Sequence, residues 1–213
     1  MHIPDGILPV PVTAAGYAAT AVTTWYTLRK IRQKQDARQG IPKASLMTAA
    51  FFVVSLIHIP IPPTSVHLVL NGLMGVLLDY YAFPAILIGL FFQAVMFGHG
   101  GLTTLGVNAI IMGLPALIAA WLFRLRHIGN KESPRKDGIL GFIAGFVAIG
   151  ISVGLFVAVL LLWMPAELNV ATERAAIYTL AIAHLPVMAI EGVITAFMVV
   201  FLRRVRPTML SNL

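Results

Sequence analysis

The chain has 213 residues, of which 59% are hydrophobic and 11% are charged, and its formal net charge is +7. Soluble domains carry about 25% charged residues, so this composition excludes an ordinary soluble protein and predicts a polytopic helical membrane protein. Cysteine is absent, which excludes disulfides, iron–sulfur clusters and zinc sites built on thiolates.

Apolar segments follow one another along the chain and predict an all-α fold with about seven transmembrane helices. In chain order they cover about 9–28, 45–61, 66–78, 82–97, 103–123, 138–163 and 178–202. The third and fourth are short, and we expect two short or tilted helices joined at a tip at Asp79–Tyr80. Before them, Pro60–Ser65 predicts a turn or irregular segment, because proline disrupts helical backbone. We expect a single integral membrane domain, residues 1–213.

Lysine and arginine are concentrated in three segments, 29–43, 124–137 and 203–206, which hold six, five and three of the fifteen. Cytoplasmic loops carry an excess of these residues. We therefore expect the N-terminus outside, the C-terminus inside, and 29–43 and 124–137 as basic cytoplasmic loops. This placement favours contact with anionic membrane lipid and argues against nucleic-acid binding. It also places the N-terminus and the Gly98–Gly101 loop on the outer face.

The chain begins Met1-His2-Ile3-Pro4-Asp5-Gly6, without the basic region of a cleaved signal peptide. Because His2 is bulky, we expect Met1 to be retained with a free amine. That amine, the His2 amide nitrogen and the His2 Nδ1 can then bind one metal ion through two adjacent chelate rings. One further imidazole would complete a square-planar set of four nitrogens, which favours Ni(II) or Cu(II). Residues 1–8 are thus a candidate metal-binding segment, although an exposed histidine without function is the alternative.

His67 is the best candidate for the fourth nitrogen, because we expect it to begin a helix on the outer side. Asn71, four residues on, would lie on the same helical face and orient the imidazole. The alternative is a structural histidine bonded to a turn carbonyl. Asp5 is expected to orient or cap the N-terminal segment rather than bind metal. Other outer polar residues either support the site, line an access route or are structural; they are His58, Gln93, His99, Asn108 and His184.

Enzyme motifs are absent or stand in the wrong context. Residues 150–154 match Gly-x-Ser-x-Gly, but they lie inside an expected transmembrane helix, whereas that motif needs a strand-to-helix turn. The chain has neither an H-E-x-x-H motif nor a P-loop. We therefore expect no enzyme activity, no ATP hydrolysis by this chain and no cofactor of its own.

The N-terminal stretch MHIPDGIL, with His67 farther along, resembles the CbiM/NikM family, the substrate-specific S-components of energy-coupling factor (ECF) transporters for cobalt and nickel. The resemblance extends over essentially the whole chain. It implies a six-helix S-component core with one added N-terminal helix, in a prokaryotic cell membrane. It also implies a metal ion held by Met1, His2 and His67.

The resemblance further implies partners: a transmembrane T-component, two ABC-type ATPase subunits and often a small accessory membrane protein. No accessory domain is fused here, so we expect that subunit to be separate. The sequence thus predicts high-affinity capture of Ni(II), or alternatively Co(II), on the outer face, followed by ATP-driven delivery. A planar four-nitrogen set favours nickel, although both branches of the family share the motif.

A secondary, ion-gradient-driven metal carrier is the rival. Such a carrier should show internal repeats and paired intramembrane acids. Here the candidate acids are Asp79 and Glu191, which are expected at different depths, and no repeat is evident.

Overall fold

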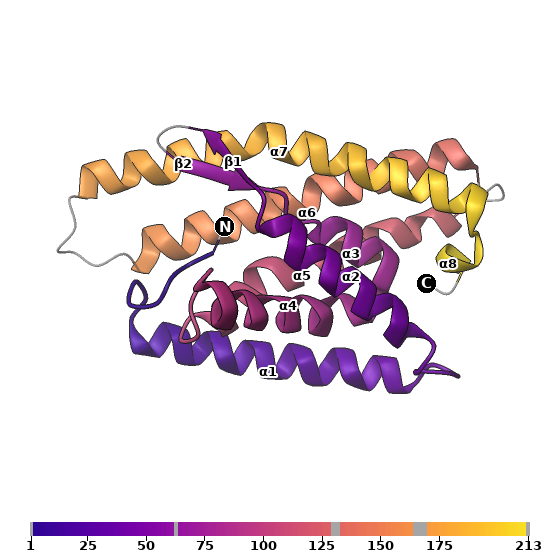
Figure 1. The fold of residues 1–213 in the computed structure, drawn as a ribbon, viewed down its shortest axis with the longest axis horizontal. Helices are drawn as coiled ribbons and strands as arrows, with labels where there is room; N and C mark the ends of the chain where they lie inside the picture. Colours follow the sequence, from indigo (N-terminus) through magenta and orange to yellow (C-terminus); the bar gives the residue numbers. More distant parts are fainter. Residues whose placement is uncertain (1, 62–63, 129–132, 164–169, 212–213) are drawn as a thin grey trace.

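The structure is a computed structural model that describes residues 2–61, 64–128, 133–163 and 170–211, with the side chains of 58–66, 170–174 and 211 excepted. Within these ranges the protein consists of helices that run back and forth between two ends, plus one β-hairpin (Figure 1). The α-helices are α1 (Val10–Arg32), α2 (Gly40–Ser55), α3 (Asn71–Leu78), α4 (Ala82–Phe97), α5 (Leu105–Arg124), α6 (Pro134–Trp163), α7 (Val170–Val205) and α8 (Thr208–Ser211). The strands are β1 (His58–Ile61) and β2 (Thr64–His67), and 3₁₀ turns cover Asp79–Tyr81 and Leu125–His127.

Four described helical stretches are long and apolar enough to cross a membrane: Asn71–Phe97, Leu105–His127, Pro134–Trp163 and Ala175–Val205. Only 28% of the most apolar part of each of the last two is buried inside the protein, so most side chains of α6 and α7 are at least partly exposed. Apolar side chains exposed in this way fit a lipid environment. The chain is a multi-pass membrane protein.

The stretch Asn71–Phe97 is a helical hairpin. A straight helix of that length would extend about 40 Å. Yet His67, before it, and His99, after it, have ring centroids only 5.4 Å apart. The chain reverses at Asp79, whose φ is +55°. The sequence predicted this pair of short helices and its tip.

The strands β1 and β2 pair in an antiparallel arrangement, which the sequence did not predict. The register pairs His58 with His67 and Ile61 with Thr64. The prolines in this segment disrupt a helix, and its β-branched residues favour extended backbone. His67 is consequently the last residue of β2, and α3 begins only at Asn71. The prediction that His67 begins a helix and shares a helical face with Asn71 was wrong.

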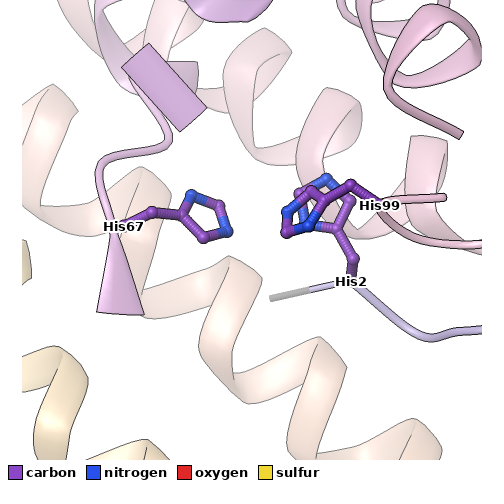
Figure 2. A group of neighbouring side chains, drawn as sticks. All are labelled: His2, His67 and His99. Atoms are coloured by element: carbon purple, nitrogen blue, oxygen red, sulfur yellow. The ribbon is translucent and has the colours of Figure 1, made fainter. Parts of the chain in front are cut away.

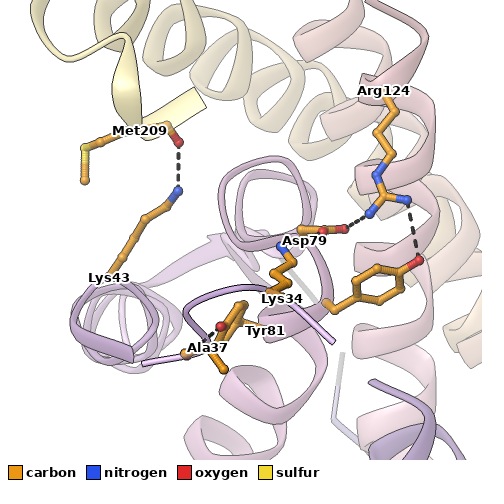
Figure 3. A network of polar contacts seen from close by, with 8 residues as sticks. Lys34, Ala37, Lys43, Asp79, Tyr81, Arg124 and Met209 are labelled. Atoms are coloured by element: carbon orange, nitrogen blue, oxygen red, sulfur yellow. Dashed lines mark hydrogen bonds and ion pairs between the residues drawn. The ribbon is translucent and has the colours of Figure 1, made fainter. Parts of the chain in front are cut away.

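Basic side chains gather at one end of the bundle, which we call the basic end. There Asp79 is buried between Lys34, at 3.1 Å, and Arg124 (Figure 3). Lys43 Nζ donates to the Met209 carbonyl over 2.8 Å, which ties α2 to α8. These ion pairs and hydrogen bonds join the ends of several helices at the basic end. The N-terminal segment lies at the opposite end (Figure 1), which we call the site end.

Candidate metal site

Three histidines converge at the site end: His2 in the N-terminal segment, His67 at the end of β2 and His99 in the loop after α4 (Figure 2). One ring nitrogen from each lies within 4.8 Å of the other two. The ring centroid of His2 is 4.0 Å from that of His99 and 5.3 Å from that of His67. Imidazole nitrogens bind a metal at about 2.0–2.1 Å, so opposite donors stand about 4 Å apart. The cluster is therefore close to the size of a site for one ion.

His67 is buried, and its hydrogen bond determines which ring nitrogen can bind metal. Its Nδ1 lies 3.0 Å from the Leu68 carbonyl oxygen. A carbonyl only accepts, so Nδ1 carries the proton and, in the neutral ring, Nε2 holds the lone pair. A backbone carbonyl that holds the far nitrogen of an imidazole is the usual support of a metal-binding histidine. A hydrogen bond to a turn carbonyl was the expected sign of a structural histidine. The same bond is equally compatible with His67 as a metal ligand.

His2 presents the complementary arrangement. Its Nε2 lies 2.9 Å from Oε1 of Gln93 on α4, and its Nδ1 is buried without a hydrogen-bond partner among the described residues. Burial holds the pKa of His2 well below its ordinary value, and the imidazoles of His99 and His67 act in the same direction. The ring is consequently neutral near pH 7, which is the form that binds metal.

The N-terminal segment is anchored to α5 directly after His2. Ile3 is fully buried, and its backbone N–H donates to Asn108 Oδ1 over 2.9 Å. Asn108 Nδ2 donates to the Ile3 carbonyl over 3.0 Å, and the Thr104 hydroxyl donates to the same carbonyl over 2.6 Å. Both backbone polar groups of Ile3 are thereby hydrogen bonded inside the protein, so detaching the N-terminal segment from α5 would cost free energy.

Asp5 binds the loop that leads into α5 and is not part of the histidine cluster. Its carboxylate accepts the backbone N–H of Leu102 at 3.2 Å, the backbone N–H of Thr103 at 2.8 Å and the Thr103 hydroxyl. The Thr103 hydroxyl, with these N–H groups, holds the pKa of Asp5 below its usual value. Gly6 turns the chain beside it with φ at +83°. The segment is therefore held on both sides of Pro4.

Asn71 does not contact His67 through the hydrogen bonds of its amide. Its Nδ2 donates instead to the Met112 carbonyl at 3.1 Å and to the Ser152 hydroxyl at 2.8 Å. Met1 lies outside the described residues, and so does the side chain of His58. His184 is buried and bonds the Leu180 carbonyl in its own helix at 2.7 Å.

Sequence reasoning gave little weight to two residues that shape the site. His99 was one of several outer polar residues, and only the fold brings its ring against His2. Glu191, fully buried on α7, accepts the backbone N–H groups of Val69 and Leu70. It thereby holds the segment that follows His67. The sequence signal for Glu191 was that acidic residues inside membrane helices are rare and usually have a functional role.

Comparison with known proteins adds the family. A family model described as "Cobalt uptake substrate-specific transmembrane region" (CbiM) matches residues 2–209. The chain belongs to the CbiM family. This CbiM-family chain is 33% identical, over 214 residues, to a Haemophilus influenzae protein provisionally named as a metal transport protein, with 100% of this chain and 98% of the relative covered. It is also 33% identical to the fused nickel transport protein NikMN of Rhodobacter capsulatus, over 99% of this chain and 64% of that longer one.

A solved structure extends the likeness to the fold of this CbiM-family chain. The crystal structure of a truncated transition metal transporter superposes with a TM-score of 0.78 and 26% identity, covering 96% of this chain and 99% of that one. Family membership and the membrane-spanning helices together identify a multi-pass membrane component for metal transport.

Proposed function

We propose that this chain captures Ni(II), or alternatively Co(II), at the outer face of the membrane and delivers it as the S-component of an ATP-driven ECF transporter. The observation that carries the proposal is the convergence of His2, His67 and His99 at the site end, beside an N-terminal segment clamped at Ile3. Names of relatives support the metals, since they include nickel and cobalt transport proteins.

The proposed donors are four nitrogens: the Met1 amine, the His2 amide, the His2 Nδ1 and the His67 Nε2. The Met1 amine is assigned from the sequence alone, because two adjacent chelate rings require an amine one residue before the histidine. The hydrogen bonds of His2 and His67 leave these two ring nitrogens with lone pairs. We assign His99 the role of an additional donor to the arriving ion, on the basis of its distance. A planar four-nitrogen set favours Ni(II) over Co(II).

We propose that the site end faces outward and the basic end faces the cytoplasm. The support is the positive-inside tendency, since Lys34, Lys43 and Arg124 lie at the basic end. An ion arriving from outside would then meet the histidines first.

We further propose that energy for delivery comes from ABC-type ATPase subunits through a T-component, with an accessory membrane protein as a possible fourth partner. The chain has no P-loop of its own. An ion-gradient carrier would need buried acids available for a coupling ion. Here Asp79 is paired with Lys34 and Arg124, and Glu191 accepts two backbone N–H groups, so both acids are already engaged.

Titration of the purified chain with Ni(II) and with Co(II), followed by visible absorption, tests the capture step. A planar nickel site of four nitrogens gives a yellow d–d band that saturates at one ion per chain. Failure to bind either ion stoichiometrically would refute the proposal.

Uptake into vesicles tests the energy source. The chain is reconstituted with its T-component and ATPase subunits, and then with ATPase subunits that cannot hydrolyse ATP. We expect uptake only in the first case. Uptake that persists with inactive ATPase subunits would instead favour the ion-gradient carrier.

A further inference from the structure

Behind His2 lies a line of buried polar side chains from two different helices. Gln93 on α4 and Ser55 at the end of α2 are both fully buried. Burying an amide and a hydroxyl among apolar helices costs free energy unless each is hydrogen bonded. Gln93 bridges the other two residues, with its Oε1 at 2.9 Å from His2 Nε2 and its Nε2 donating to the Ser55 hydroxyl.

The donor and acceptor in each hydrogen bond of this line follow from the bond that the Ser55 hydroxyl makes at the end away from His2. The Ser55 hydroxyl donates its one proton to the Phe52 carbonyl over 2.9 Å, and a carbonyl can only accept. Toward Gln93 the hydroxyl must therefore act as acceptor, so it faces the amide NH₂ group. Gln93 Oε1 is then turned to His2 and also can only accept. His2 Nε2 must consequently carry the proton.

A neutral imidazole carries one proton, so the Nδ1 of His2 is left with a lone pair. That nitrogen is buried and has no hydrogen-bond partner among the residues that the structure describes. Only Nδ1 closes a six-membered ring with a metal bound to the amide nitrogen of the same residue, because Nε2 points away across the imidazole. A ring turned over about its Cβ–Cγ bond would present carbon to the metal instead.

We propose that Ser55 and Gln93 are positioning residues for metal capture, which fix both the orientation of the His2 ring and its Nε2–H tautomer. This inference rests on the proposed function, in which Nδ1 of His2 enters the chelate. Gln93 holds the ring, and Ser55 prevents the Gln93 amide from turning over. With the amide reversed, its NH₂ group would face Nε2, and the proton would have to move to Nδ1 and block the metal.

Two substitutions of Gln93 separate positioning from packing. Gln93→Met keeps the length and approximate volume of the side chain but removes the acceptor. Gln93→Glu keeps an acceptor for His2, and its charged oxygen is a strong enough acceptor to draw the Ser55 hydroxyl away from the Phe52 carbonyl, which a neutral amide oxygen is not. We expect Ni(II) affinity to fall about 10–100-fold in Gln93→Met, as for other groups that support a metal-binding histidine, and to recover in Gln93→Glu. Gln33→Met, at the exposed end of α1, is the matched control and should bind as the unaltered chain does.

The tautomer is read without metal, from ¹⁵N shifts of histidine-labelled protein in detergent micelles, with His2 assigned by comparison with His2→Ala. We expect a protonated Nε2 and an unprotonated Nδ1 in the unaltered chain, and loss of this single state in Gln93→Met. Ser55→Ala, a smaller change, should also mix the two tautomers, and it keeps the test available if Gln93→Met does not fold.

A protonated Nδ1 in the unaltered protein, or unchanged nickel affinity in both Gln93→Met and Ser55→Ala, would overturn the inference. Failure of the unaltered chain to bind nickel or cobalt is a separate result, which would refute the proposed function. The two are distinguishable because the nitrogen shifts are measured in metal-free protein.

Discussion

Asn108 binds the backbone of Ile3 through both ends of its amide, with the Ile3 N–H donating to Oδ1 over 2.9 Å and Nδ2 donating to the Ile3 carbonyl over 3.0 Å. The Asn108 amide thus makes the same pair of hydrogen bonds with Ile3 that a neighbouring β-strand would make through its backbone. It holds the chain one residue after His2, so it limits where the imidazole and the preceding backbone can lie. The position of the proposed chelate therefore depends on α5, which lies more than a hundred residues away in sequence.

Replacement of Asn108 by leucine should weaken nickel binding. Within the described part of the chain, the buried Ile3 N–H loses its only acceptor, which costs about 1–3 kcal/mol for an unsatisfied group, and the Ile3 carbonyl keeps only the bond from the Thr104 hydroxyl. The N-terminal segment is then detached from α5 for part of the time. We expect about 10–100-fold weaker Ni(II) binding, measured by calorimetric titration. Gln33→Leu at the exposed end of α1 is the control. Equal affinity in Asn108→Leu and the unaltered chain would contradict the anchoring role.

Extension of the chain by one residue ahead of Met1 should abolish high-affinity binding. The terminal amine would move out of the five-membered ring that it forms with the His2 amide nitrogen. Titration with Ni(II), followed by the d–d band, measures the loss. Stoichiometric binding with unchanged affinity by the extended protein would sink the chelate model.

His67→Ala should weaken nickel binding strongly, because it removes a proposed donor. His99→Ala should have a smaller effect, since the four proposed planar nitrogens remain. His127→Ala is the matched control, because that histidine lies beside Arg126 at the basic end. Affinities from the same titration decide the order. Equal losses in His67→Ala and His127→Ala would refute the assignment of the site to one end of the bundle.

Gly101→Ala should also weaken binding, although it touches no proposed donor. A Cβ at Gly101 would lie 2.1 Å from Asp5 Oδ1 and 2.6 Å from the Asp5 backbone nitrogen, so the N-terminal segment would have to move. Gly154→Ala is the control, because a Cβ there meets nothing within 4 Å. We expect about tenfold or greater loss of nickel affinity in the first variant, within the range seen when a support of a ligand is removed. The prediction fails if the two glycine variants bind alike.

Asp79→Asn should lower stability without altering the metal site. Its carboxylate is buried between Lys34 and Arg124, and the amide cannot balance their charge. Loss of a buried partner costs several kcal/mol, but both cations are about one-third exposed, so we expect about 1–2 kcal/mol. Thermal unfolding in micelles measures it. Nickel affinity of the folded fraction should not change, and a parallel loss of affinity would show that the two ends are coupled.

Much of the architecture was predictable because a bilayer imposes simple rules on sequence. Apolar length predicted the helices, and charge placement predicted that the basic segments share an end. The tip at Asp79 was predictable because a charge and two tyrosines interrupt an apolar run. The β-hairpin was not, since the same prolines and β-branched residues are also compatible with an irregular turn.

The candidate site was predictable in part, for a chemical reason. The order Met1-His2 alone makes two adjacent chelate rings possible, because the amine, the amide and the imidazole belong to neighbouring residues. His67 was a candidate from its expected side of the membrane, although its place on a strand was not foreseen. Asn71 was expected to support His67, and its amide bonds Met112 and Ser152 instead.

The sequence by itself determined a membrane protein, the approximate positions of its helices and its basic segments, and it carries the prediction of a chelate at the N-terminus, since each depends on residues close together in the chain. Only the tertiary structure decided that His99 lies against His2, that Asn108 holds Ile3, and that Gln93 bonds both His2 and Ser55. Those contacts join residues from different helices, and their geometry follows from packing rather than from any local pattern.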